Sequence, residues 1–177
     1  MTDLPQRLPD AELLCANLVG QLKGRVGPQV GMIGIATGGA WLAERLHGEL
    51  GLHLPMGVLD ASFYRDDFNQ KGLKSQVKPS RVPFDVQGRH ILLVDDVLYT
   101  GRTVRAAMNE LFDYGRPAKI ELAVLIDRGE RELPVAAQYV GATLTVPKGS
   151  ILVLERNASG ELSLRLSDRR REHRAHP

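Results

Sequence analysis

The residues best suited to chemistry form one short run, in which two adjacent acids precede a turn rich in hydroxyl groups. The run reads Val94-Asp95-Asp96-Val97-Leu98-Tyr99-Thr100-Gly101-Arg102-Thr103. Ionised Asp95 and Asp96 can only accept hydrogen bonds, which suits two neighbouring hydroxyl groups of a ligand. The hydroxyls of Thr100 and Thr103 are donors, and Gly101 permits a tight turn. Acids followed by an anion-binding turn suit a sugar phosphate such as ribose 5-phosphate.

The segments on either side of this run predict how it is held. Residues 91–94 are apolar β-formers and predict a buried strand. Over residues 104–111 apolar side chains recur at helical spacing, until a glycine and a proline end the pattern. A helix that begins in the turn presents unpaired N–H groups and the positive end of its dipole to a phosphate. The sequence therefore predicts a strand, a binding loop and a helix, in that order.

The acid pair has a second interpretation, because two carboxylates at the end of a strand also suit Mg²⁺. Phosphoacceptor receiver domains carry such a pair. Those domains need further partner residues that are not found in this sequence, and a metal site of that kind would leave the hydroxyl-rich turn unexplained. The sugar-phosphate site is therefore the favoured interpretation.

The rest of the chain repeats the order strand, turn, helix, which predicts an α/β fold with a mainly parallel sheet. Strands are expected at residues 30–35, 56–64 and 120–126, helices at residues 40–50 and after the cap residue Asp10, and a closing hairpin at residues 151–154 and 162–166. Parallel sheets bind ligands beyond the carboxyl ends of their strands, which is where the acid pair is expected to lie.

Three blocks of the sequence resemble the type I phosphoribosyltransferases, which join a nitrogenous base to 5-phosphoribosyl 1-diphosphate (PRPP). The run at residues 94–103 resembles their PRPP-binding motif. Two further blocks are similar to the branch of pyrimidine-operon regulators that are also uracil phosphoribosyltransferases: Phe63-Tyr64-Arg65-Asp66-Asp67 and Asp127-Arg128-Gly129-Glu130-Arg131-Glu132-Leu133-Pro134. The resemblance spans residues 9–141. It implies a mainly parallel central sheet flanked by helices, with a flexible lid hairpin and a small hood.

The resemblance implies one phosphoribosyltransferase domain at residues 1–166, with the lid at residues 62–83 and the hood at residues 127–166. Residues 167–177 would form a basic, disordered tail. The lid segment is long and rich in Lys, and a connection of that length inside a domain is commonly functional. Such a lid would close over bound diphosphate and shield the reacting sugar from water.

The resemblance also implies the roles of individual residues. PRPP would be bound by Asp95, Asp96, Val97, Tyr99, Thr100, Gly101, Arg102 and Thr103, and its diphosphate by the loop Thr37-Gly38-Gly39. The main chain around Ile126, Asp127 and Arg128 would read the base. Catalysis would depend on Asp95 and Asp96 with Arg65 of the lid, and Mg²⁺ would be bound mainly through PRPP. Because purine-salvage relatives carry Asp where this chain has Tyr99, a pyrimidine base is favoured.

The expected reaction converts uracil and PRPP to UMP and pyrophosphate, in a protein that regulates pyrimidine biosynthesis genes. The alternative is a non-catalytic or weakly catalytic regulator that responds to UMP or PRPP and acts through pyr leader RNA or a protein partner. Basic residues are expected in RNA-binding relatives where this chain has Glu130, Ala137 and Ala142, so RNA binding is expected to be weak or absent. A homo-oligomer, dimer or tetramer, is also implied.

Composition sets the remaining expectations. The chain has 177 residues, 43% of them hydrophobic, which suits a single globular domain. The net charge of +2 resides in residues 167–177, so the rest of the chain has no general attraction for nucleic acid. The single cysteine, Cys15, excludes an intrachain disulfide framework. With no membrane-length apolar run and no signal-peptide pattern, a cytoplasmic protein is expected.

Overall fold

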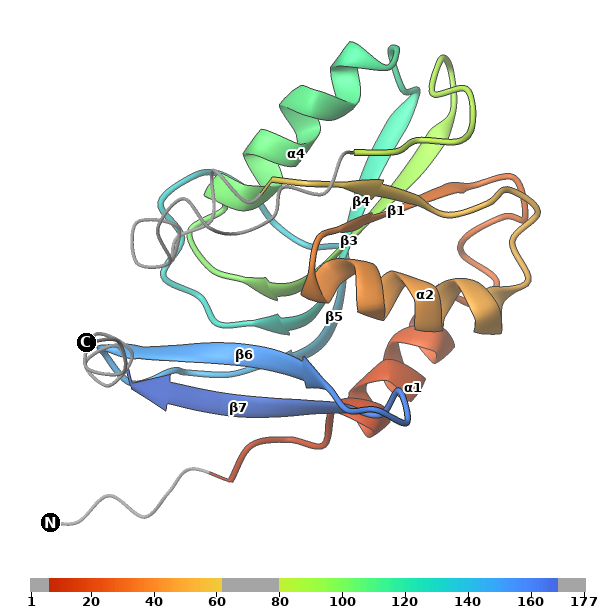
Figure 1. The fold of residues 1–177 in the computed structure, drawn as a ribbon. Coiled ribbons are helices and arrows are strands. Elements are labelled where there is room, and N and C mark those ends of the chain that lie inside the picture. The colour runs from red at the N-terminus through yellow and green to blue at the C-terminus, as the bar shows by residue number, and fades with distance from the viewer. Residues whose placement is uncertain (1–6, 62–79, 169–177) are drawn as a thin grey trace, which may run out of the picture.

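A five-stranded parallel sheet forms the centre of the computed structural model, which describes residues 7–61 and 80–168 (Figure 1). The strands are β1 (Gly31–Ile35), β2 (Gly57–Leu59), β3 (His90–Leu98), β4 (Lys119–Asp127) and β5 (Tyr139–Thr143). Their order in the sheet is β2-β1-β3-β4-β5, and every neighbouring pair is parallel. The predicted α/β fold with a mainly parallel sheet is confirmed.

Helices cover both faces of this sheet. Helices α1 (Ala11–Leu22) and α2 (Gly38–Leu50) pack on one face and α4 (Arg102–Asp113) lies on the other (Figure 1). Side chains of β3 alternate between the two cores: Leu92 belongs to the α1 and α2 side, and Leu93 to the α4 side. Burial on both faces explains why β3 reads as an unbroken apolar run.

The order of the strands creates a switch point between β1 and β3. Helix α2 leads from β1 to β2, on one side of the pair, whereas α4 leads from β3 to β4, on the other side. The two connections therefore diverge above the carboxyl ends of β1 and β3. In open α/β sheets this crevice is the usual place for a ligand.

Several element boundaries differ from the sequence predictions. The strand expected at residues 56–64 is observed only over Gly57–Leu59, and its last three residues lie outside the described part of the chain. The helix expected from residue 40 begins two residues earlier, at Gly38. Strand β5 was not predicted. It is short, largely half-exposed and interrupted by a glycine, so it lacks the apolar pattern on which strand prediction depends.

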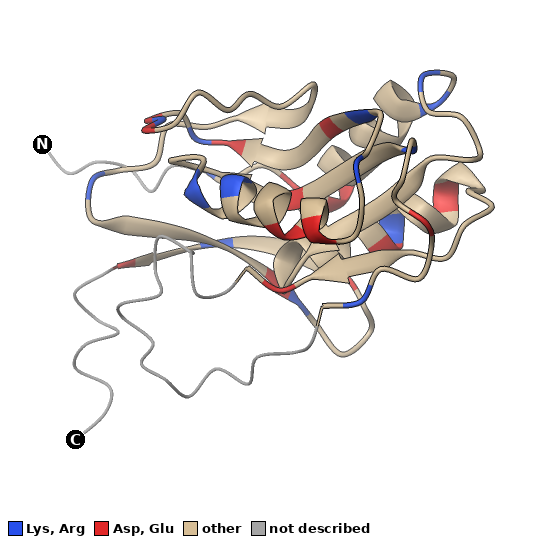
Figure 2. Cartoon of the chain, turned by 90° about the horizontal axis from the view of Figure 1, so that it is seen from above, with Lys and Arg blue, Asp and Glu red and all other residues tan. Residues whose placement is uncertain are grey.

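Charged side chains of both signs are distributed over the described elements. Figure 2 shows Lys and Arg interspersed with Asp and Glu along the helices and strands. Some of them pair between elements, such as Arg156 with Glu44 at 2.7 Å. Within residues 7–61 and 80–168, no helix is both long enough and apolar enough to cross a membrane.

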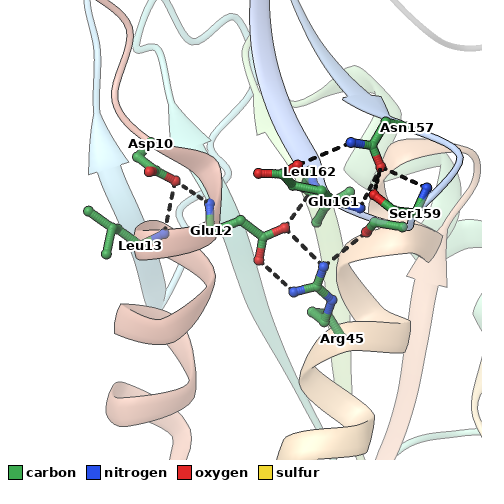
Figure 3. Close-up of polar contacts among 9 residues, drawn as sticks. Asp10, Glu12, Leu13, Arg45, Asn157, Ser159, Glu161 and Leu162 are labelled. Atoms are coloured by element: carbon green, nitrogen blue, oxygen red, sulfur yellow. Dashed lines mark hydrogen bonds and ion pairs between the residues drawn. The ribbon is translucent and has the colours of Figure 1, made fainter.

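The antiparallel hairpin β6 (Ser150–Arg156) and β7 (Leu162–Asp168) was predicted and is fixed to α1 and α2. Figure 3 shows Glu12 at the centre of this junction, next to the helix cap Asp10. Glu12 pairs with Arg45 and accepts a 2.7 Å hydrogen bond from the Leu162 amide, while Arg45 donates to the Gly160 carbonyl at 2.9 Å. One ion pair thus joins the hairpin to both helices.

Candidate functional site

The acid pair lies inside strand β3 rather than beyond its end, which corrects the sequence prediction of a strand limited to residues 91–94. Pairing of β3 with β1 stops at Val94, opposite Gly34, but pairing with β4 continues to Leu98, opposite Asp127. Asp95 and Asp96 are only 2% and 5% exposed. The acids therefore occupy the stretch of β3 that lies beyond its pairing with β1, at the switch point.

The glycines predicted to bind pyrophosphate lie directly against this acid pair. A Cβ atom on Gly39 would be 2.6 Å from the Val94 carbonyl oxygen and 2.9 Å from the Asp95 Cα, and one on Gly38 would be 2.7 Å from Asp96 Cγ. No larger residue fits, so the two glycines allow α2 to begin in contact with β3. The structure brings these two predicted parts of the site together.

The predicted pyrophosphate loop forms the amino terminus of α2. Helix α2 begins at Gly38, within the predicted loop, and the exposed Thr37 precedes it after a cis peptide bond from Ala36. The Thr37 side chain makes no capping hydrogen bond to the first amides of α2. N–H groups of a first helical turn carry partial positive charge and suit a phosphate group.

The predicted phosphate loop, residues 100–103, forms the start of α4. Gly101 adopts a φ of +92°, which disfavours any side chain, and α4 begins at Arg102. The Thr100 hydroxyl accepts a 3.2 Å hydrogen bond from the Arg102 amide, while the Arg102 side chain pairs with Glu132 at 2.8 Å. The acid pair is therefore in contact with the start of α2 and shortly precedes the start of α4 in the chain.

The residues predicted to read the base follow at the end of β4. Arg128 donates its amide to the Leu98 carbonyl at 3.0 Å, and its guanidinium carbon lies 3.9 Å from the centre of the Tyr99 ring. This side chain is 7% exposed, and its Nε is buried with no hydrogen-bond partner in the described part of the chain. The Asp127 carboxylate accepts from the Gly129 amide at 2.9 Å and from Arg131 at 2.7 Å. A buried donor without a partner is costly and suggests a place for a polar ligand atom.

Of the lid predicted at residues 62–83, residues 62–79 with Arg65 lie outside the described residues, and so do residues 169–177 of the predicted tail. Residues 167 and 168 were expected in that tail but end strand β7, where they pair with β6. The residues that border the lid segment are described and lie side by side. Val58 and Arg81 exchange two main-chain hydrogen bonds, at 2.8 and 2.7 Å. Arg81, which follows residues 62–79 in the chain, therefore lies next to β2.

Arg131 was quoted in a motif but was not predicted to be a site residue. Its guanidinium donates to the Tyr99 carbonyl at 2.6 Å, to Asp127 at 2.7 Å and to the Val135 carbonyl at 2.8 Å. Two of these acceptors are main-chain oxygens, whose availability does not depend on the identity of their residues. These contacts therefore cannot be predicted from a sequence pattern.

Cys15 is not suited to a nucleophilic role. Burial, as the main cause, raises the pKa of its thiol to about 11. A thiol with such a pKa holds almost no thiolate near neutrality, and the thiolate is the reactive form.

The donor set at the acid pair is compatible with Mg²⁺ without forming a complete metal site. Within residues 7–61 and 80–168, no group of three or more His, Cys, Asp or Glu side chains could hold a metal ion. Asp95 and Asp96 supply carboxylate oxygens, which Mg²⁺ accepts, but it usually needs substrate phosphates and waters to complete its shell.

The chain is similar to several known proteins. The family described as "Phosphoribosyl transferase domain" matches residues 6–152. A "Bifunctional protein PyrR" of Ralstonia nicotianae is 52% identical over 155 residues, covering 85% of this chain and 88% of the relative. One from Pseudomonas entomophila is 59% identical over 114 residues, covering 64% and 66%. A solved hypoxanthine-guanine phosphoribosyltransferase of Bacillus anthracis shares the fold, with a TM-score of 0.63 at 20% identity, over 81% of this chain and 86% of that one.

Proposed function

Because the chain belongs to the phosphoribosyltransferase family and is a relative of the bifunctional PyrR proteins, we propose that it forms UMP and pyrophosphate from uracil and PRPP. One observation carries this proposal: the buried acid pair lies in contact with the start of α2 and shortly before the start of α4. Two anion sites flanking a pair of hydroxyl acceptors match a sugar with phosphate at one end and diphosphate at the other.

Each part of PRPP has a counterpart in this arrangement. Asp95 and Asp96 would accept hydrogen bonds from the two ribose hydroxyls. Amides at residues 100–103 would hold the 5-phosphate, and those of Gly38 and Gly39 the diphosphate. Mg²⁺ would be bound mainly through PRPP and would neutralise charge on the diphosphate, and Asp95 and Asp96 would be the protein carboxylates nearest in chemistry to its preferred ligands. The chain's own contribution is fixed positioning and electrostatics, with no covalent nucleophile.

The base is expected to lie between the end of β4 and Tyr99. The main chain at Ile126, Asp127 and Arg128 would lie along one edge of the base, and the buried Nε of Arg128, which has no partner among the described residues, would donate to a uracil carbonyl. Tyr99 supplies no carboxylate to assist a purine, and its ring is held by the Arg128 guanidinium. Arg65, in the predicted lid, would act on the diphosphate.

The test is UMP formation from uracil and PRPP with Mg²⁺, beside hypoxanthine, guanine and orotate as competing bases. The wild type should convert uracil alone, and Asp95→Asn/Asp96→Asn should lose at least about 100-fold in rate because both hydroxyl acceptors lose their charge. Asp113→Asn, an exposed acid at the end of α4, is the matched control and should remain active. Conversion of a purine, or full activity in the double variant, would contradict the proposal.

The regulatory role is proposed as the second function of the same protein, since the relatives are named as bifunctional. Binding of pyr leader RNA is expected to be weak, because Glu130 and Ala137 stand at expected basic positions and charges of both signs mix in Figure 2. A gel shift showing sub-micromolar, UMP-dependent binding to leader RNA near physiological salt would overturn that expectation. A cytoplasmic homo-oligomer, dimer or tetramer, remains part of the proposal, and light scattering would measure the assembly.

A further inference from the structure

The loop at residues 128–133 contacts three consecutive carbonyl groups that lead into the phosphate loop. The Leu98 carbonyl accepts from the Arg128 amide at 3.0 Å, and the Thr100 carbonyl accepts from the Glu132 and Leu133 amides, each at 3.0 Å. The carbonyl between them, that of Tyr99, accepts from the side chain of Arg131 at 2.6 Å. All three carbonyls are therefore held on the side of the loop at 128–133.

Holding a carbonyl also orients the next N–H group in the chain. A trans peptide is planar, so the N–H of one residue points away from the carbonyl of the residue before it. These three peptide bonds are trans. Because the carbonyls of Leu98, Tyr99 and Thr100 point toward the loop at 128–133, the N–H groups of Tyr99, Thr100 and Gly101 point away from it. Successive N–H groups on one side form an anion-binding concavity.

We propose that Arg131 is a positioning residue for the 5-phosphate, since its hydrogen bond to the Tyr99 carbonyl aims the Thr100 N–H into the phosphate loop. This inference rests on the phosphate-binding part of the proposed function. Arg131 touches no substrate atom; it acts through the peptide that joins Tyr99 and Thr100. The other two carbonyls are held by main-chain donors, so Arg131 is the member of this set that a side-chain substitution removes.

The surroundings of Arg131 are suited to fixing a peptide. Its side chain is 23% exposed and that of Asp127 is 21% exposed, so water competes little for either. One end of the guanidinium is held by Asp127 and the Nε by the Val135 carbonyl, which leaves the remaining end aimed at Tyr99. The planar fork of Arg can satisfy these acceptors at once, whereas the ammonium of Lys cannot span them.

The arrangement also assigns a role to the Asp127 carboxylate. Both of its oxygens are engaged, one by the Gly129 amide and the other by Arg131. Asp127 therefore orients Arg131 with its side chain. An Asp127→Asn variant keeps the size and one acceptor oxygen but loses the charge, so it should weaken phosphate binding less than removal of Arg131.

The test compares UMP with uridine, which lacks only the phosphate, by isothermal titration calorimetry. Arg131→Met should weaken UMP binding about 10- to 100-fold, the range expected for losing a well-aimed hydrogen bond to a charged group, and change uridine binding less than about 3-fold. Arg131→Lys should recover only part of the loss. Arg165→Met, which removes an exposed ion pair with Glu155 on the hairpin, should bind both ligands as the wild type does.

Three results would overturn the inference. Equal losses for UMP and uridine would mean that Arg131 only stabilises the fold, and full recovery in Arg131→Lys would mean that charge alone matters. A wild type that binds no UMP would also overturn it. UMP synthesis is measured on the same preparations: a wild type that binds UMP but makes none refutes the proposed activity, while the UMP-to-uridine comparison still decides the role of Arg131.

Discussion

Replacing Gly39 by alanine tests the contact between α2 and the acid pair. The new Cβ would lie 2.6 Å from the Val94 carbonyl oxygen and 2.9 Å from the Asp95 Cα, and both atoms belong to the main chain of β3. Ordinary contact begins at 3.4 Å, so one of the two elements has to move by about 0.8 Å. Strand β3 is paired on both sides at Val94, so the start of α2 is expected to move.

The magnitude follows from this displacement. Overpacking of a buried contact costs about 1–3 kcal/mol, which lowers the melting temperature of a chain of this size by about 2–12 °C. The protein should therefore stay folded at 25 °C. A shift approaching 1 Å in a positioning group reduces catalysis by about 100-fold, so Gly39→Ala should lose far more activity than stability.

Two further glycines make the comparison sharper. Gly48 lies in the same helix, and a Cβ atom added there would have no neighbour within 4 Å, so Gly48→Ala should keep full activity and add about 0.5–1 kcal/mol of helix stability. At Gly38 the obstacle is the Asp96 carboxylate, which can rotate, so Gly38→Ala should lose activity with a smaller loss of stability. Thermal melts and the kcat and KM for PRPP measure both quantities. Wild-type kinetics in Gly39→Ala would refute the reasoning.

Two other predictions concern α1. Hydrogen bonds from Arg45 and from the Leu162 amide hold the pKa of Glu12 below its ordinary value of 4.5, so this stabilisation is present above pH 4.5 and is lost as the pH falls through the folded-state pKa. Glu12→Gln should therefore lower the free energy of unfolding by about 1–2 kcal/mol at pH 7, with the difference from wild type shrinking in acid denaturation series; an unchanged difference at pH 3 would contradict this. Burial raises the pKa of the Cys15 thiol to about 11, so Ellman's reagent at pH 8 should react with it only after unfolding, and rapid reaction of the native protein would show that the helix face is open.

Elements with a strong apolar period were predictable from the sequence. The helix expected after the phosphate loop is observed as Arg102–Asp113, and the strand expected at residues 120–126 is observed as Lys119–Asp127. In both cases burial determines the pattern of apolar residues, because the core covers one face of the helix and both faces of the strand. Asp10 was likewise recognisable as a cap, and it accepts from the amides of Glu12 and Leu13.

Features that depend on a neighbouring element were not predictable in the same way. The end of β3 is set by β4, which continues to pair after β1 has turned into α2, and an acid pair inside a strand gives no local sign of this. Strand β5 owes its place to Gly141, where a Cβ would lie 2.5 Å from the Leu125 carbonyl oxygen. From sequence alone that glycine reads as a break in a strand rather than as a close packing contact.

The candidate site likewise has a part that could be proposed from the sequence and a part that depends on neighbouring elements. Its side chains could be proposed from the sequence because acids at Asp95 and Asp96 and a hydroxyl at Thr100 are the residue types expected to bind a sugar phosphate. Its geometry depends instead on main-chain contacts: Gly39 against the Val94 carbonyl at one end, and the loop at 128–133 against three carbonyls at the other. Main-chain groups are the same in every residue, so the sequence shows such contacts only where they exclude a side chain, as at Gly39. The contact of Arg131 with the Tyr99 carbonyl excludes no residue type at Tyr99, so it becomes visible only when β3 and β4 are placed side by side. In the proposed complex the diphosphate and 5-phosphate ends would be positioned by different elements, α2 and the loop at 128–133, so the Gly39 and Arg131 substitutions should perturb them separately.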